Sequence, residues 1–243
     1  MKNNKQQIAI IGFGRFGKLL AEILSPYGDI SVISRKPIKD NKYRQIEYKD
    51  LKDIDWVIPS VPISSLKKVL KEIKPFLKKG SLVMDVCSVK VHPNKWMQEI
   101  LSSDIQILAS HPMFGPDSVK NGKLENLDIV FCPTRINKDK LKEVENIFKE
   151  MGLTVVETTP EDHDQQNAIS LALVHFIGRG LKGIDVNHQK ITTMGFKRLL
   201  QLKDNVTNDS MELFRDMNNF NPYAKEIRRK YVESLQKIDS MLE

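Results

Sequence analysis

The sequence predicts an α/β domain followed by an all-helical C-terminal domain, and three observations support this. Short apolar runs alternate with helical patterns over the first two-thirds of the 243 residues. Strands interleaved with helices are typical of a parallel sheet covered on both faces. Beyond Pro160 the chain has long amphipathic patterns and no convincing strand. We therefore expect residues 1–158 to form the α/β domain and residues 159–243 the helical domain.

Seven segments of the first domain have the apolar character of buried strands. They are Gln7–Ile11, Ile30–Ser34, Trp56–Pro59, Leu82–Val86, Gln106–Ser110, Asp128–Cys132 and Thr154–Glu157. Between them, helical patterns predict helices over Phe16–Ser25, Ser64–Leu77 and Lys138–Met151. Ser64 is the expected N-cap of the second helix, and Pro75 should distort its last turn.

The composition excludes several classes of protein. Hydrophobic residues make up 40% and charged residues 28% of the chain, which excludes a disordered or fibrous protein. No apolar run approaches the ~20 residues of a membrane span, so no membrane partner is expected. Two cysteines and a polar N-terminus predict a cytoplasmic protein. The net charge of +7 comes from scattered lysines, which indicates a solvated surface and not a nucleic-acid site.

A glycine-rich turn, Gly12-Phe13-Gly14-Arg15-Phe16-Gly17, joins the first strand to the first helix. In the pattern G-x-G-x-x-G the first glycine permits a tight turn, the second lets a pyrophosphate approach, and the third lets helix and strand pack closely. The helix then presents unpaired N–H groups to the phosphates. This context predicts a Rossmann-type dinucleotide-binding domain. The predicted cofactor-contacting residues here are Gly12, Gly14, Arg15, Phe16, Gly17, Pro59 and Ser60.

The end of the second strand indicates which dinucleotide binds. A site for NAD usually offers Asp or Glu there to bind the ribose 2′-hydroxyl. This chain has Ser34, Arg35 and Lys36 instead. Two cations and a hydroxyl suit a 2′-phosphate, whereas the alternative interpretation is a basic surface turn. The sequence therefore predicts NADP as the cofactor and these three residues as its ligands.

Two further segments carry polar side chains after predicted strands. In Asp85–Lys90, the hydroxyl of Ser88 and the amine of Lys90 are expected to point into one cleft. The segment beginning at Ser110 holds His111 next to a proline, which predicts a stiff loop at the end of a strand. Open α/β sheets bind ligands at the carboxyl ends of their strands. His111 is therefore a candidate catalytic residue.

Together these segments resemble the prephenate/arogenate dehydrogenase family of tyrosine biosynthesis. The resemblance rests on the glycine turn, on Asp85–Lys90 and on His111–Gly122, which reads HPMFGPDSVKNG. Through these segments, Ser34-Arg35 and His175–Arg179, the chain is most similar to NADP-dependent arogenate dehydrogenases of the plant type. The resemblance implies oxidative decarboxylation of a cyclohexadienyl acid: L-arogenate to L-tyrosine, or prephenate to 4-hydroxyphenylpyruvate. We favour L-arogenate.

The same resemblance implies roles for single residues of the first domain and of the helical domain. His111 would accept the proton of the ring hydroxyl while hydride leaves the ring, with Ser88 hydrogen-bonding beside it. His175 corresponds to an active-site histidine that contacts substrate. Asp164, next to His163, is the predicted partner of an arogenate ammonium, or else a charge at the start of a helix.

A substrate carboxylate also needs an anchor. Bacterial members hold it with an arginine, and the matching position here is Lys197-Arg198. The anchor could be either of these residues or neither, because lysine lacks the bidentate geometry of arginine. Arg179 is a further candidate, although an arginine near a helix end is more often part of a surface ion pair.

Two other functions fit part of the sequence. A β-hydroxyacid-type dehydrogenase shares the glycine turn and the helical domain, but its acid/base lysine would leave His111 without a role. A non-catalytic NADP-sensing protein on a dehydrogenase fold is the other alternative, which the intact Ser88, His111 and His175 argue against. No metal site is predicted. The resemblance and the many apolar positions in Ile169–Leu181 and Leu199–Phe214 predict a homodimer through the helical domain.

Overall fold

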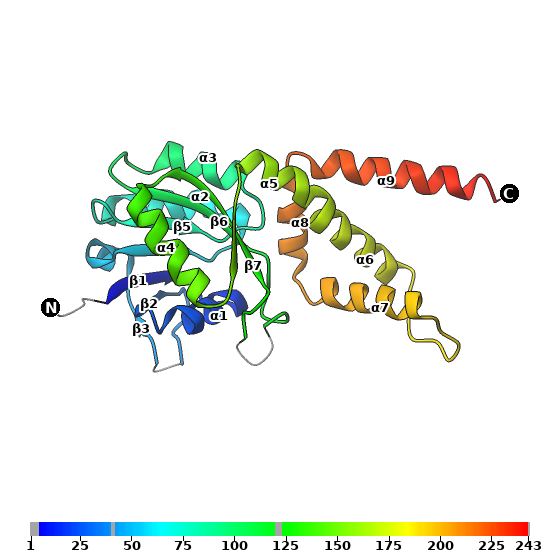
Figure 1. The fold of residues 1–243 in the computed structure, drawn as a ribbon, viewed down its shortest axis with the longest axis horizontal. Helices are drawn as coiled ribbons and strands as arrows, with labels where there is room; N and C mark the ends of the chain where they lie inside the picture. Colours follow the sequence, from blue (N-terminus) through cyan, green and yellow to red (C-terminus); the bar gives the residue numbers. More distant parts are fainter. Residues whose placement is uncertain (1–4, 40–41, 120–122, 243) are drawn as a thin grey trace. The chain divides into compact units, whose positions relative to one another are not determined.

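The computed structural model describes residues 5–39, 42–119 and 123–242. The chain divides into two compact units, Met1–Pro160 and Glu161–Glu243, as Figure 1 shows in blue to green and in yellow-green to red. The division lies two residues beyond the predicted domain boundary. Among the described residues, no helix is long and apolar enough to cross a membrane.

The first unit, called the sheet unit below, is built on one eight-stranded sheet in the order β3-β2-β1-β4-β5-β6-β7-β8. Its strands are β1 (Gln6–Ile11), β2 (Gly28–Ile33), β3 (Arg44–Gln45), β4 (Trp56–Pro59), β5 (Leu82–Asp85), β6 (Gln106–Pro112), β7 (Asp128–Arg135) and β8 (Thr154–Glu157). All seven predicted strands are present, and the short edge strand β3 is additional. The order of the first six strands, which reverses at β1, is that of a Rossmann-type sheet.

The sheet is parallel as predicted except at one pair of strands, where the last two strands extend it. β7 runs antiparallel to β6 and pairs Val130 with His111, whereas the other neighbouring strands are parallel. A parallel partner requires a crossover, usually through an α-helix. The described residues between β6 and β7 contain no helix. The chain therefore turns back along β6 instead of crossing over.

In its described part, the sheet unit also contains four α-helices and two short 3₁₀ segments. They are α1 (Arg15–Leu24), α2 (Ile63–Ile73), α3 (Val91–Ile100), α4 (Lys138–Glu150), η1 (Tyr48–Asp53) and η2 (Lys74–Phe76). Helix α3 was not predicted, because its buried side is made by Pro93, Asn94 and Met97 and has little apolar periodicity. The core lies between helices and sheet, for example where Phe131 of β7 meets Phe148 of α4 edge to face at 5.6 Å.

Helix α2 corrects one detail of the prediction and confirms another. It begins at Ile63 with Pro62 at the N-cap, so Ser64 lies inside the first turn and is not the cap. Proline suits this end of a helix, because the first N–H groups have no partner within the helix. As predicted, Pro75 ends the regular helix, which tightens into η2 after Ile73.

The second unit, called the helical unit, contains only helices in its described part, as predicted. They are α5 (Pro160–Asn167), the π-helical segment η3 (Ala168–Leu173), α6 (Val174–Gly183), α7 (Met194–Thr207), α8 (Met211–Asn219) and α9 (Ala224–Asp239). Small side chains let these helices approach closely. A Cβ atom on Gly178 of α6 would lie 2.4 Å from Val206 Cγ2 of α7. Ala168, Ala172 and Ala224 form a similar contact between η3 and α9.

Candidate active site

The glycine turn has the geometry that a bound dinucleotide requires. Gly12 has φ +101°, and a Cβ atom there would lie 2.3 Å from the carbonyl oxygen of Ser60. A Cβ atom on Gly17 would lie 2.1 Å from the carbonyl oxygen of Gly12. At Gly14, by contrast, a Cβ atom would meet nothing within 4 Å, and this residue begins α1 without a side-chain cap. The open glycine and the uncapped helix end fit a pyrophosphate.

The basic loop Ser34–Lys36 directly follows β2, beside the glycine turn. The Gly12 amide donates to the carbonyl oxygen of Ile33 at 2.8 Å, which joins the two segments. The side chains of Arg35 and Lys36 are exposed, and the hydroxyl of Ser34 accepts the amide hydrogen of Lys36 at 3.3 Å. The loop therefore offers two cations and one hydroxyl at the sheet edge where Rossmann folds hold the adenosine ribose.

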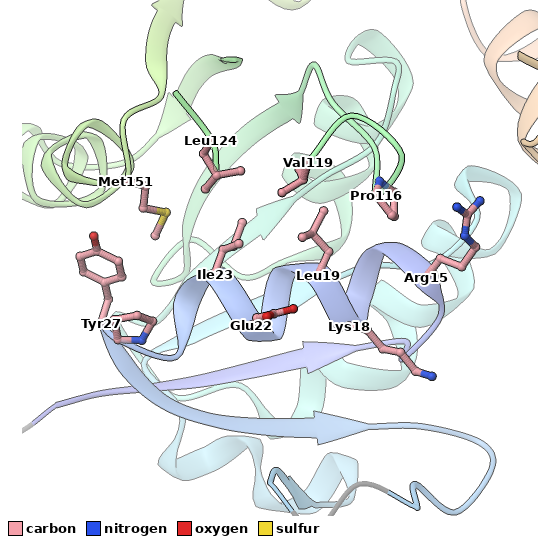
Figure 2. Close-up of a pocket in the computed structure, with 11 residues that line it drawn as sticks. Arg15, Lys18, Leu19, Glu22, Ile23, Tyr27, Pro116, Val119, Leu124 and Met151 are labelled. Atoms are coloured by element: carbon pink, nitrogen blue, oxygen red, sulfur yellow. The ribbon is translucent and has the colours of Figure 1, made fainter. Parts of the chain in front are cut away.

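Arg15 and Phe16 connect the glycine turn to the segment that follows β6. The guanidinium of Arg15 forms an ion pair with Asp117 at 2.5 Å. The ring centroids of Phe16 and Phe114 are 6.4 Å apart. Figure 2 shows Arg15 at one end of a groove of about 560 Å³ that follows α1 as far as Tyr27. The HPMFGPDSVKNG segment thus packs against α1, although its last residues, 120–122, lie outside the described residues.

A fully buried ion pair joins β5, which precedes Ser88, to β6, which contains His111. Lys90 Nζ lies 2.5 Å from Asp85 Oδ2 and also donates to the carbonyl oxygen of Ser110. Asp85 Oδ1 accepts the Ser110 amide at 3.2 Å, and the Ser110 hydroxyl donates to the Asp85 carbonyl oxygen at 2.5 Å. The prediction that the Lys90 amine points into a cleft is therefore wrong. It lies in the interior, where it ties the end of β5 to β6.

Two predicted catalytic residues lie at the carboxyl ends of the neighbouring strands β5 and β6. His111 is buried and belongs to β6 itself, so the prediction of a loop after the strand is wrong. Pairing with β7 extends the strand through Pro112, which lies opposite Ile129. Ser88 follows β5, and its Oγ is buried with no hydrogen-bond partner in the described part of the chain. The Ser88 hydroxyl is therefore not committed to another described side chain and can hydrogen-bond to a ligand group.

His175 and Arg179 lie one turn apart on α6. Nδ1 of His175 is buried without a partner among the described residues, and its Nε2 lies 3.8 Å from Asp209 Oδ2. Burial lowers the pKa of His175; the Asp209 carboxylate opposes this and Arg179 adds to it. Arg179 donates to the carbonyl oxygens of Val206 and Asp209 at 3.2 and 2.6 Å. The guanidinium thus caps the turn between α7 and α8, which favours a structural role over a carboxylate anchor.

Asp164 occupies a polar cluster inside the helical unit. Its carboxylate is fully buried and lies 2.8 Å from Nδ1 of His163. Asn167 contacts the other ring nitrogen of His163 at 2.6 Å, and Asn221 donates to the Asp164 carbonyl oxygen at 2.8 Å. These bonds link α5 to the turn before α9. They favour a structural role for Asp164 over the predicted contact with a substrate ammonium.

The predicted carboxylate anchors Lys197 and Arg198 are exposed in the first turn of α7. Thr193 caps that turn by accepting the Phe196 amide at 3.1 Å. A positive pair at a helix amino end is unfavourable for the helix dipole, so binding an anion there would relieve a local cost. Their role as anchors stays a prediction.

Sequence reasoning gave no role to Asp85, although it stands in the quoted segment. The signal was present, because an acidic residue and a lysine five positions apart flank a stretch that is apolar apart from Ser88. Buried charges require partners, so such a pair indicates an internal ion pair. No comparable signal marks Asn167 or Asn221. Their hydrogen-bond partners are determined by how the helices pack.

Comparison with known proteins assigns the family. Residues 33–157, which include Ser88 and His111, match the family model described as prephenate dehydrogenase, nucleotide-binding domain. The chain belongs to the prephenate dehydrogenase family. Residues 181–243 match a second model, described as TYRAAT1-like, C-terminal domain.

Three relatives extend the match over nearly the whole chain. Arogenate dehydrogenases 1 and 2 (chloroplastic) of Arabidopsis thaliana are each 32% identical to it, over 98% and 100% of its length. A probable arogenate/prephenate dehydrogenase of Methanocaldococcus jannaschii is 28% identical over 100%. The chain spans 39%, 69% and 58% of these relatives, in that order.

Solved structures of family members share the fold. Prephenate dehydrogenase from Aquifex aeolicus, in complex with hydroxyphenyl propionate and NAD+, superposes with a TM-score of 0.80 at 20% identity, covering 100% of this chain and 92% of that one. Synechocystis arogenate dehydrogenase gives a TM-score of 0.72 at 18% identity, with coverage of 98% and 93%. The Rossmann-type nucleotide-binding domain and the helical C-terminal region predicted from the sequence are thereby confirmed.

Proposed function

We propose that the protein catalyses the NADP-dependent oxidative decarboxylation of L-arogenate to L-tyrosine. The observation that carries this proposal is the sheet edge where Ser88 and His111 follow or end neighbouring strands, with the glycine turn packed against the segment after His111. This arrangement supplies a base and a hydroxyl beside a nucleotide site. Membership in the prephenate dehydrogenase family supports the same reaction.

The residues of the chain have separable tasks in this reaction. NADP+, when bound, supplies the hydride acceptor. His111 accepts the proton of the ring hydroxyl, so that the carbon can release its hydrogen with two electrons while the ring carboxylate leaves as carbon dioxide and the ring becomes aromatic. Ser88 orients that hydroxyl with its own unpartnered Oγ. The Asp85–Lys90 pair holds β5, which precedes Ser88, against β6, which contains His111.

NADP is proposed over NAD because of the loop after β2. Arg35 and Lys36 are exposed there, and the sequence has no carboxylate at this position for a free ribose hydroxyl. Charge-assisted hydrogen bonds from arginine suit a phosphate better than neutral ones do. The loop therefore favours a cofactor with a 2′-phosphate.

L-arogenate is proposed over prephenate because the two relatives with 32% identity are arogenate dehydrogenases. The replacement of a single arginine anchor by Lys197-Arg198 is consistent with this choice. The test is NADPH formation with arogenate and prephenate side by side. Turnover of arogenate at least as fast as prephenate supports the proposal, and a tenfold preference for prephenate contradicts the substrate. If NADP+ binds and neither substrate reacts, the NADP-sensing alternative is the better account.

A homodimer through the helical unit is part of the proposal. Ten large apolar side chains of that unit are exposed, including Val232, Leu235 and Ile238, which lie at three-residue intervals along α9. Soluble monomers seldom expose extended apolar patches, so such a face indicates a partner surface. Light scattering at micromolar concentration is expected to give twice the chain mass of 27.9 kDa. A monomer mass contradicts this part of the proposal.

A further inference from the structure

We propose that Gln45 is a positioning residue that shapes the basic loop Ser34–Lys36 and the two residues after it for a 2′-phosphate. This inference rests on the proposed use of NADP. Gln45 belongs to the two-residue strand β3, which sequence reasoning did not predict, and its side chain is exposed. Among the described residues, the hydrogen bonds of its side chain go to the loop that carries Arg35.

The amide group of Gln45 forms three hydrogen bonds to the backbone of this loop. Nε2 donates to the carbonyl oxygens of Ser34 and Lys36 at 3.0 and 3.3 Å. Oε1 accepts the amide hydrogen of Ile38 at 3.0 Å. The three contacts bracket Arg35 on both sides and reach two residues further along. One side chain thus holds the backbone of the whole loop in a single conformation.

Gln45 can hold the loop because its own segment is anchored twice. β3 pairs in parallel with β2, and the amide of Ile46 donates to the carbonyl oxygen of Val32 at 3.0 Å. Tyr43 is buried and meets Phe13 of the glycine turn edge to face, with ring centroids 5.9 Å apart. The segment 43–46 therefore connects the predicted pyrophosphate site with the predicted 2′-phosphate site.

The physical consequence is pre-organisation. A long side chain such as Arg35 loses conformational freedom when it binds a phosphate, and a loop that must also become ordered adds to that cost. Gln45 orders the backbone of the loop before the cofactor binds. Less of the favourable free energy of the phosphate contact is then offset by the entropy cost of ordering the loop, and the binding affinity is higher. NAD has no 2′-phosphate, so its binding should depend on Gln45 only weakly.

The test is the affinity of the 243-residue chain for NADP+ and NAD+, measured by calorimetry without substrate. Gln45→Leu removes all three hydrogen bonds at similar side-chain size. It is expected to weaken NADP+ binding about five- to tenfold and NAD+ binding less than about twofold. Gln106→Leu is the matched control, because Gln106 of β6, away from β3 in the sheet, donates to the Gly80 carbonyl oxygen at 3.1 Å and accepts the Asn137 amide at 3.1 Å. It should change neither affinity.

A double-mutant cycle separates positioning from general stabilisation. If Gln45 acts through Arg35, most of the effect of Gln45→Leu on NADP+ disappears in the Arg35→Ala background. Equal weakening of both nucleotides, or no weakening of NADP+, would overturn the positioning role while leaving the proposed function intact. A wild-type protein that binds NAD+ as tightly as NADP+ would overturn the cofactor proposal, and the role of Gln45 with it.

Discussion

The sheet unit and the helical unit differ in how many of their large apolar side chains are exposed to solvent. Among the described residues, the larger sheet unit exposes three large hydrophobic side chains (Phe76, Met113 and Val156), whereas the helical unit exposes ten. A sheet covered by helices encloses its core, while a few amphipathic helices leave faces open. The larger exposed apolar surface of the helical unit supports the proposed homodimer through that unit.

Buried polar atoms without a hydrogen-bond partner among the described residues occur in both units. In the sheet unit the buried charges Asp85 and Lys90 satisfy each other and the neighbouring backbone, while the Ser88 hydroxyl of the proposed site has no partner. In the helical unit, His175 and Arg179 each have a buried nitrogen without such a partner. We therefore expect chemistry and cofactor binding to depend on the sheet unit, and substrate contact and assembly to depend on the helical unit.

The largest expected effect tests whether the chemistry belongs to the sheet unit. His111→Asn keeps the size of the side chain and some hydrogen bonding but removes the proton acceptor. We expect kcat to fall by about 10²- to 10⁴-fold with NADP+ affinity retained. Steady-state kinetics and calorimetry measure the two quantities. His175→Asn in the helical unit is the comparison, and it should raise KM more than it lowers kcat. A large loss of kcat in His175→Asn and a small one in His111→Asn would instead identify His175 as the base.

The buried ion pair offers a stability test of the sheet unit. Lys90→Met leaves Asp85 buried without its cation, which is expected to cost about 3–5 kcal/mol of unfolding free energy. Replacing both partners, as Asp85→Asn with Lys90→Met, should recover much of that loss, because no charge stays buried. Denaturant unfolding measures both. Lys230→Met, which breaks the exposed Lys230–Glu226 pair of α9, is the control and should have little effect. Similar losses for both lysines would contradict a special role for the buried pair.

Two glycines differ in their surroundings. Gly178 of the helical unit is closely packed, whereas Gly14 of the sheet unit faces open space at the predicted pyrophosphate site. Gly178→Ala places a Cβ atom 2.4 Å from Val206 and is expected to destabilise the helical unit by about 1–3 kcal/mol. Gly14→Ala meets no atom within 4 Å, so it should leave stability nearly unchanged and weaken nucleotide binding instead. Thermal unfolding and NADP+ titration distinguish the two. A stability loss at Gly14 as large as at Gly178 would contradict the open cradle.

The basic loop gives a specificity test confined to the sheet unit. Arg35→Ala is expected to weaken NADP+ binding by about ten- to a hundredfold and to leave NAD+ binding nearly unchanged. Binding assays with both nucleotides provide the measurement. Equal loss for the two would show that Arg35 does not recognise the 2′-phosphate.

The smallest expected effect is a pH dependence in the helical unit. Burial lowers the pKa of His175 in the folded protein. The unfolded chain takes up this proton near pH 6.5, whereas the folded chain does so only at lower pH. The unfolded state therefore binds more protons in between, and the free energy of unfolding should fall as the pH drops below about 6.5. Denaturant unfolding of wild type and His175→Asn between pH 5 and 8 measures the contribution. An identical pH dependence in both proteins would contradict it.

The strands, the glycine turn and the switch to helices near residue 160 were readable in the sequence because each rests on local periodicity or on a local backbone requirement. Apolar runs make buried strands wherever they pair, and Gly12 with φ +101° needs glycine whatever surrounds it. The positions of Ser88 and Arg35 after strands followed from the same local patterns, whereas His111 lies within β6. Helix α3 was not predicted, because Pro93 and Asn94 on its buried side interrupt the apolar periodicity of a helix.

The tertiary structure decided what depends on which segments meet. The direction of β7, and with it the inclusion of His111 in β6, follows from pairing between strands that are distant along the chain. The inward course of Lys90 toward Asp85, the burial of Asp164 against His163 and the contacts of Gln45 with the basic loop are pairings of the same kind. A polar side chain shows its chemistry in the sequence, but its partner is chosen by the fold, because hydrogen bonds and ion pairs act over a few ångströms of space and not along the chain.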